Sequence, residues 1–126
     1  MAGVDSIVSF QGPLGAPTVD HPRAERLVSG NPERRTWNLF TDASESVFSG
    51  IWECEPGAWQ VSYPLNQDEF CTLLSGRVRL TDASGATHEF GPGDAFVIPG
   101  GFAGVWETLS ALRKLYVIVS KPIAAP

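Results

Sequence analysis

Short segments rich in β-branched and aromatic residues follow one another between residues 34 and 120, each bounded by Gly, Pro, Asn, Asp or Ser. Such punctuation is typical of strands in an all-β domain, and we expect hairpin turns at Ser75–Gly76 and Asp82–Gly85. With 13 Gly and 10 Pro in 126 residues, a helical bundle is excluded. A sandwich, a barrel or a jelly roll remains. The segments are RRTWNLF, SVFSGIWECE, AWQVSYPL, EFCTLLSG, RVRLTD, THEF, DAFVIP, AGVWETL and LRKLYVIVS.

The chain divides into three parts around one domain. Residues 1–33 are rich in Gly, Pro and Asp and predict an arm that lies on the domain or on a partner chain, with one helical turn between Asp20 and Leu27. Residues 34–120 form the β-domain, and residues 121–126 form a tail. The continuously apolar run from Leu115 to Val119 predicts a strand that is covered on both faces.

Composition excludes several classes of function. The net charge of −5 argues against nucleic acid as a partner, because a phosphate backbone requires a basic surface. No apolar stretch is long enough to span a membrane, and the first residues lack the pattern of a signal peptide, which predicts a cytoplasmic protein. Cys54 and Cys71 are too few for a disulfide framework, and this agrees with a reducing compartment.

Two glycine-framed stretches, Gly57–Gly76 and Gly93–Thr108, decide among the β architectures. Their spacing resembles the two cupin motifs, GX5HXHX3EX6G and GX5PXGX2HX3N. Residues 34–120 resemble, more narrowly, the small single-domain cupins related to ureidoglycine aminohydrolase and to the ethanolamine-utilisation cupins. The resemblance implies an all-β, cupin-type jelly-roll β-barrel. It implies no particular activity, because cupins host many unrelated ones.

The histidine positions of both motifs are substituted in this chain. The first motif has Tyr63 and Leu65 in place of its histidines, and the second has Gly104. Only Glu69, with the phenol of Tyr63, could still ligate a metal, and transition metals prefer imidazole. His21 and His88 lie outside both motifs, and His88 is expected in a solvated hairpin. We therefore expect no tightly bound metal and no cofactor.

The period of two in a strand predicts which side chains face the barrel interior. An aromatic cup of Trp59, Tyr63 and Trp106 is expected around Glu69, an arrangement typical of small-molecule sites. Three groups of residues should each share an inward face: Trp59, Val61, Tyr63 and Leu65; Glu69, Cys71 and Leu73; Gly104, Trp106 and Thr108.

Glu69 is the candidate general acid or base, and Tyr63 is the candidate hydrogen-bond donor to developing charge. The candidate substrate-binding residues are Trp59, Cys71, Trp106, Lys114 and Tyr116. Lys114 and Tyr116 share one face of the last strand, but the sequence leaves open whether this face points inward. In the alternative reading Glu69 is structural and forms an ion pair with Arg77, Arg79 or Lys114, while the aromatic residues are plain core.

Three functions fit this pattern. The first is a metal-independent enzyme (an isomerase, lyase or amide hydrolase) that acts on a small polar metabolite. The second is a barrel that binds such a molecule without turnover, and the third is a structural or regulatory protein. A homodimer is expected in each case, because the arm has too little apolar content to fold alone and a small barrel has strand edges to cover.

Overall fold

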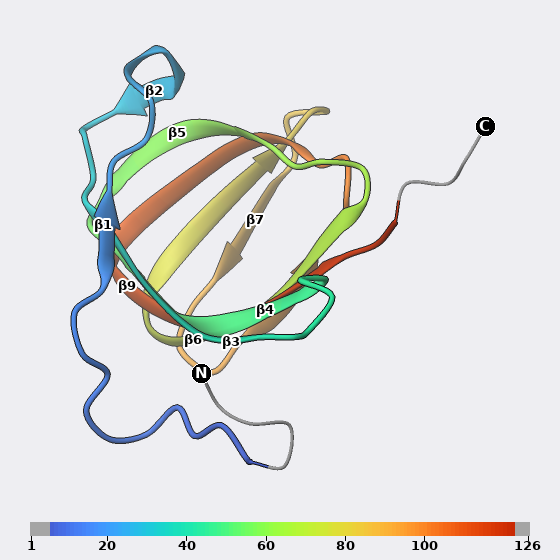
Figure 1. Cartoon of the computed structure of the whole chain (residues 1–126). Coiled ribbons are helices and arrows are strands. Elements are labelled where there is room, and N and C mark those ends of the chain that lie inside the picture. The colour runs from blue at the N-terminus through green and yellow to red at the C-terminus, as the bar shows by residue number, and fades with distance from the viewer. Residues whose placement is uncertain (1–5, 123–126) are drawn as a thin grey trace.

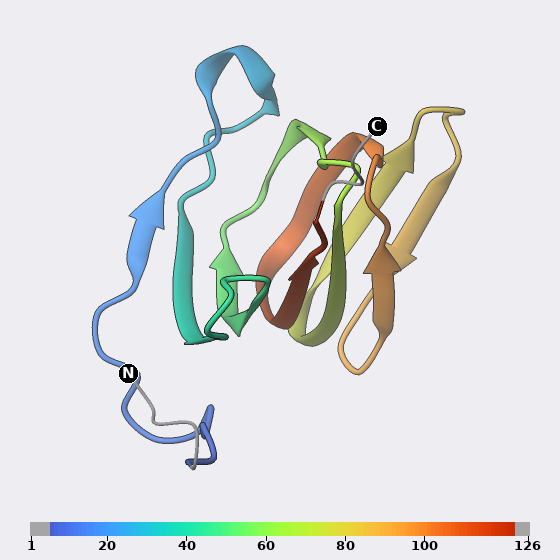
Figure 2. The ribbon, with the colours of Figure 1, turned by 45° about the vertical axis from the view of Figure 1, so that its right-hand side comes forward.

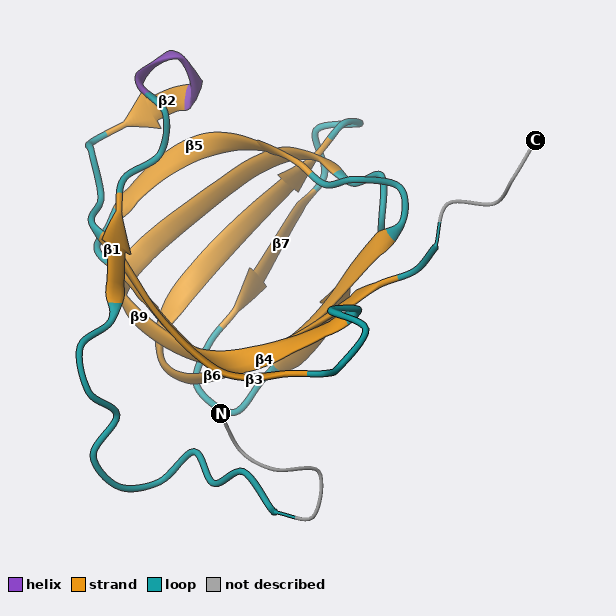
Figure 3. Cartoon of the chain, viewed as in Figure 1, coloured by secondary structure: helices purple, strands orange, loops and turns teal. Residues whose placement is uncertain are grey.

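The computed structural model describes residues 6–122; residues 1–5 of the predicted arm and 123–126 of the predicted tail lie outside the described residues. Almost all regular structure is strand, with one short 3₁₀-helix (Figure 3). Within residues 6–122, no helix is long and apolar enough to cross a membrane. The elements are β1 (Thr18–Asp20), η1 (Ala24–Arg26), β2 (Leu27–Ser29), β3 (Arg34–Thr41), β4 (Val47–Cys54), β5 (Gly57–Ser62), β6 (Gln67–Asp82), β7 (Thr87–Phe90), β8 (Ala95–Ile98) and β9 (Ala103–Ser120).

The strands form one antiparallel sheet that curls around a common interior (Figures 1 and 2). Strand β9 is the centre of the arrangement, since its first half pairs with β5, its second half pairs with β4, and β6 pairs along both halves. Strands β7 and β8 then pair with β6. The all-β jelly-roll prediction is confirmed, and every inward face of β4, β5, β6 and β9 meets the same interior.

The predicted turn at Ser75–Gly76 is wrong, because β6 continues through these residues. The register between β6 and β9 shifts on both sides of Ser75, and Gly76 has a φ of 83°. A Cβ atom at Gly76 would lie 2.3 Å from the carbonyl oxygen of Ala111 on β9. Gly76 therefore forms a bulge that lets two long strands stay paired. The turn predicted from Asp82 is confirmed: Asp82 Oδ1 accepts hydrogen bonds from the backbone of Ser84 and Ala86 between β6 and β7.

The prediction that Leu115–Val119 is covered on both faces is also wrong. Along β9 the side chains alternate, so that Lys114 and Tyr116 are buried while Val117 and Val119 are exposed on the outer face. The apolar core lies on the inner face and consists of Cys54, Trp59, Cys71, Leu73, Val78, Leu80, Ile98, Trp106 and Leu112.

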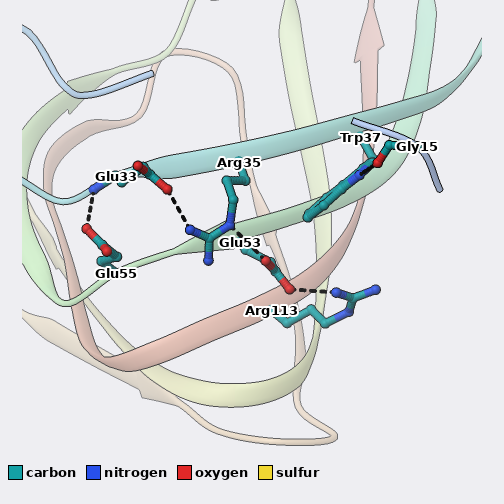
Figure 4. Close-up of polar contacts among 7 residues, drawn as sticks. All are labelled: Gly15, Glu33, Arg35, Trp37, Glu53, Glu55 and Arg113. Atoms are coloured by element: carbon teal, nitrogen blue, oxygen red, sulfur yellow. Dashed lines mark hydrogen bonds and ion pairs between the residues drawn. The ribbon is translucent and has the colours of Figure 1, made fainter. Parts of the chain in front are cut away.

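Much of the predicted arm adds to the same sheet. Strand β1 pairs with β3, and β2 pairs with β5, so residues 18–29 run along one side of the barrel. Nearer the N-terminus, the carbonyl of Gly15 accepts a 3.0 Å hydrogen bond from Trp37 Nε1 on the outer face of β3 (Figure 4). The predicted helical turn corresponds to η1, which lies between β1 and β2.

Candidate functional site

A cavity of about 820 Å³ opens between the barrel strands and the segment that carries β1 and η1. This volume is in the range of pockets that take small molecules. Its wall combines aromatic side chains with several charged ones. The lining residues on which the following argument depends are Asp20, His21, Arg23, Arg26, Arg34, Asn38, Trp52, Trp59, Tyr63, Glu69, Trp106, Lys114 and Tyr116.

Lys114 and Glu69 form a buried ion pair in the wall of this cavity. Lys114 Nζ donates a hydrogen bond to Glu69 Oε2 at 3.0 Å, and the two residues are only 4% and 6% exposed. The inward direction of Lys114, which the sequence left open, follows from its alternation with the outward Arg113 on β9. Of the cations that the sequence offered as partners of Glu69, Lys114 is the one that binds it. Arg79 instead forms ion pairs with Glu89 and Glu107.

Two indole rings contact the lysine, one from the neighbouring strand β4 and one from an earlier part of β9 itself. Lys114 Nζ lies 4.5 Å from the ring centroid of Trp52 and 4.6 Å from that of Trp106. These distances are those of cation–π contacts, in which the negative faces of the rings attract an ammonium group. Trp59 completes the cluster, with ring centroids 6.4 Å from Trp52 and 6.2 Å from Trp106. The aromatic cup predicted from the sequence is therefore present, and it surrounds the ammonium as well as the carboxylate.

The phenol of Tyr63 occupies the other side of the carboxylate. Tyr63 Oη donates to Glu69 Oε1 at 3.2 Å, so each carboxylate oxygen has one protein donor. Tyr116 also points inward from β9 and donates from Oη to Asn38 Oδ1 at 2.8 Å. Both tyrosines line the cavity and can offer hydroxyl groups to a bound molecule.

Burial changes the acid–base properties of these groups. It raises the pKa of Tyr63 well above its ordinary value, and Glu69 adds to this effect; burial also raises the pKa of Tyr116 to about 12. Burial lowers the pKa of Lys114, but the attraction of Glu69 outweighs it, and the net direction is upward. At neutral pH the site thus holds an ammonium group and two neutral phenols.

Cys71 and Thr108 support the site from behind the cavity wall. Cys71 is fully buried, is not among the cavity-lining residues, and lies with Sγ 3.5 Å from Lys114 Nζ. Burial raises the pKa of its thiol to about 12, which leaves it uncharged at neutral pH. Thr108 Oγ1 accepts a 2.9 Å hydrogen bond from Trp106 Nε1 and fixes this ring against Lys114.

Tyr63, Leu65 and Gly104, which stand at the histidine positions of the cupin motifs, do not form a ligand set for a metal ion. The prediction that Leu65 faces inward is wrong, because β5 ends at Ser62 and the chain turns at Pro64, so Leu65 is 87% exposed. Gly104 contributes no side chain. Within residues 6–122, no group of three His, Cys, Asp or Glu side chains could hold a metal. The carboxylate of Glu69 is already bound by the ammonium group of Lys114.

Several cavity residues escaped the sequence analysis. The segment that contains Trp52 predicts a strand, but nothing in it marks Trp52 as a site residue. Asn38 lies on the face of β3 that lines the cavity, and the alternation of side chains along this strand could have identified that face. His21 lines the cavity of its own chain, with Nδ1 3.2 Å from the carbonyl oxygen of Asn31. His88 lies in the exposed β7 hairpin, as predicted from the sequence. Its Nε2 lies 3.1 Å from Asp82 Oδ2.

Solved structures give the same fold. A DUF861-family protein of unknown function from Pseudomonas syringae pv. tomato is 27% identical with a TM-score of 0.74, and the match covers 84% of this chain and 45% of that protein. The chain thus spans less than half the length of this relative. The EutQ protein of Clostridium difficile matches at 23% identity and a TM-score of 0.62, covering 83% of each chain. A putative ethanolamine utilization protein Q from Salmonella typhimurium matches at 19% identity and a TM-score of 0.62, covering 88% of this chain and all of that one.

The sequence itself also identifies a family. No curated protein matches the chain. The model of the EutQ-like cupin domain matches residues 41–116, a range that contains both glycine-framed stretches and most of the residues around the buried ion pair. The chain belongs to the EutQ-like cupin domain family.

Proposed function

We propose that this protein is an enzyme that transfers protons on a small polar metabolite without a metal, with Glu69 as acid or base. The observation that carries the proposal is the Lys114–Glu69 pair, which lies in the wall of a cavity large enough for such a molecule. A buried ion pair costs desolvation energy and adds little net stability, so its position in a cavity favours a chemical role.

The geometry supports isomerase or lyase chemistry beside a carbonyl group. Glu69 would remove a proton from the carbon next to the carbonyl, while Lys114 and Tyr63 would donate hydrogen bonds to the oxygen on which negative charge develops. An isomerisation returns the proton to a neighbouring atom and needs no further reactant. The pKa of both donors is raised, so both keep their protons at neutral pH.

The test is a screen of small polar metabolites by thermal shift in the presence of EDTA, followed by assays for turnover of the hits. Wild-type protein should bind and convert at least one compound, whereas Glu69→Gln should bind it and lose at least ~100-fold in rate, the typical contribution of general acid–base catalysis. Lys121→Gln, a change at an exposed surface pair, is the control. Turnover by Glu69→Gln at the wild-type rate would contradict the proposal.

A second candidate function is ligand binding without turnover. The observation that favours it is that both carboxylate oxygens of Glu69 already accept hydrogen bonds, one from Lys114 and one from Tyr63. Glu69 held in this way can fix Lys114 and Tyr63 in place, and these two donors can then position a polar ligand. Hits that bind to wild type and to Glu69→Gln with equal affinity, and that neither protein converts, would support this function over the first.

Metal independence is a separate part of the proposal. We propose that Lys114, and not a metal ion, supplies the fixed positive charge beside the substrate. Elemental analysis of the purified protein should find no stoichiometric transition metal, and activity should survive dialysis against EDTA. About one metal ion per chain, lost together with activity on chelation, would contradict it.

We also propose that two copies of the chain associate in the cytoplasm. Phe70 pairs in register with Val97 and with Val117, and all three are exposed on the outer face of β8, β6 and β9. Such a row of exposed apolar side chains suits a symmetric interface. Sedimentation should give a dimer, and Phe70→Glu should give a monomer of 13.6 kDa. A monomeric wild type at micromolar concentration would contradict the dimer.

A further inference from the structure

Positive charge is concentrated at the cavity, although the chain as a whole is acidic. Four of the nine Lys and Arg residues line the cavity, but only two of the fourteen Asp and Glu residues do so. A concave site with charges of one sign attracts ligands of the opposite sign. We infer that the cavity takes a small organic acid, whose carboxylate lies between Arg23 and Arg26. This inference rests on the proposed function and adds the substrate class.

Two of the four cations are already paired within the protein. Arg34 donates two hydrogen bonds to the carboxylate of Asp20, at 2.9 and 2.7 Å, and its guanidinium lies 5.2 Å from the centre of the Trp59 ring. Lys114 is held by Glu69. Within residues 6–122, neither Arg23 nor Arg26 has a carboxylate partner, so the cavity keeps an excess of positive charge for a ligand.

The short helix η1 directs both free arginines to one side. Arg23 precedes the helix and Arg26 ends it, and the backbone amide of Arg26 donates to the carbonyl of Arg23 at 2.9 Å. This hydrogen bond closes a single turn with Arg23 at its start and Arg26 at its end, and both side chains line the same cavity. Arg26 Nη1 also lies 3.5 Å from the carbonyl oxygen of Gln60 on β5, so its side chain is directed toward the barrel.

The surroundings favour an organic acid over an inorganic anion. Guanidinium groups match the planar, two-oxygen geometry of a carboxylate. The cavity that these arginines share with the Lys114–Glu69 pair is also lined by Trp59 and Val61, which suit the apolar part of a ligand. A molecule with a carboxylate at one end and a polar group at the other would contact both regions.

Tryptophan fluorescence can measure the charge of the cavity without knowledge of the natural ligand. Trp52, Trp59 and Trp106 line the cavity, whereas Trp37 lies outside it. We expect the double variant Arg23→Gln/Arg26→Gln to lower the quenching constant of the anion iodide about twofold to threefold relative to wild type, without lowering that of the cation caesium. Arg77→Gln, which removes an exposed arginine that does not line the cavity, is the matched control and should change nothing.

A matched acid and amide test the ligand class directly. In saturation-transfer NMR, phenylacetate should bind wild type about tenfold more tightly than phenylacetamide, and the double variant should lose this preference while Arg77→Gln keeps it. Equal binding of acid and amide, tighter binding of inorganic phosphate, or unchanged iodide quenching in the double variant would overturn the inference. Glu69→Gln should keep the preference for the acid even where it abolishes turnover, so failure of this inference is distinguishable from failure of the proposed function.

Discussion

Adjacent residues of β9 carry ion pairs on opposite faces of the sheet, and the two pairs differ in every physical respect. Lys114 points inward to Glu69, with side chains 5% and 8% exposed. Arg113 points outward to Glu53, which also binds Arg35, and these side chains are 35%, 21% and 33% exposed (Figure 4). The outer network is exposed enough to be screened by salt, while the inner pair is largely shielded from bulk solvent. The same strand thus carries a surface ion-pair network on its outer face and a buried ion pair in the cavity wall on its inner face.

The first prediction breaks the inner pair. Lys114→Met leaves Glu69 as a buried carboxylate without its cation, and we expect a loss of about 3–5 kcal/mol in the free energy of unfolding. The matched outer change, Arg113→Met, should cost less than about 1 kcal/mol, because Glu53 is only partly buried and keeps Arg35 as a partner. Urea unfolding at pH 7.5 measures both. Equal losses would show that burial does not distinguish the pairs.

A double variant sharpens this result. Glu69→Gln in the Lys114→Met background removes the stranded carboxylate, so it should restore part of the stability that the single variant loses. The two changes should therefore be strongly non-additive. Additive losses would mean that Lys114 and Glu69 do not interact in solution.

The second prediction uses alkaline pH. The pKa of Lys114 is raised in the folded protein, and in an unfolded chain it is about 10.4, so the folded state holds the proton more tightly. Its stabilising effect is complete below pH ~10.4 and is lost as the pH rises toward the folded pKa. Tyr63 and Tyr116 act in the same direction, because burial raises their pKa.

Urea unfolding at pH 9 and pH 11 checks this sign. Wild type and Arg113→Met should lose stability in parallel, while Lys114→Met should lose less because only the buried tyrosines and the buried Cys54 and Cys71 still contribute. A Lys114→Met protein whose stability declines as steeply as that of wild type would assign the whole effect to the tyrosines and the buried cysteines.

The smallest expected effect concerns the outer network. Glu53→Gln removes the acceptor shared by Arg35 and Arg113 and should cost about 1 kcal/mol or less in low salt, with the cost reduced in 1 M NaCl. Glu69→Gln should be nearly insensitive to salt, since its ion pair is buried. Unfolding curves of both variants at the two salt concentrations measure the difference. A cost that depends on salt for Glu69→Gln would mean that water enters the site.

Local patterns in the sequence predicted most of the strands because the alternation of side chains and the turn residues act over a few neighbours. This logic placed Glu69, Cys71 and Leu73 inside. It failed at Leu65, where Pro64 ends the alternation, and at Gly76, where the same residue type that forms turns forms a bulge. Glycine signals an unusual backbone but does not say whether the chain reverses there.

The sequence by itself determined the β-rich fold, the family resemblance through the glycine-framed motifs, and the residue types at positions 63, 65 and 104, none of which is histidine. Only the tertiary structure decided that Lys114 meets Glu69, because their contact depends on the register of β6 against β9 across 45 residues of separation. The register of distant strands is set by the packing of the whole interior and not by either segment alone. For the same reason, the sequence alone does not place Arg23 and Arg26 at the cavity. They line it because β1 and β2, on either side of η1, pair with strands of the barrel.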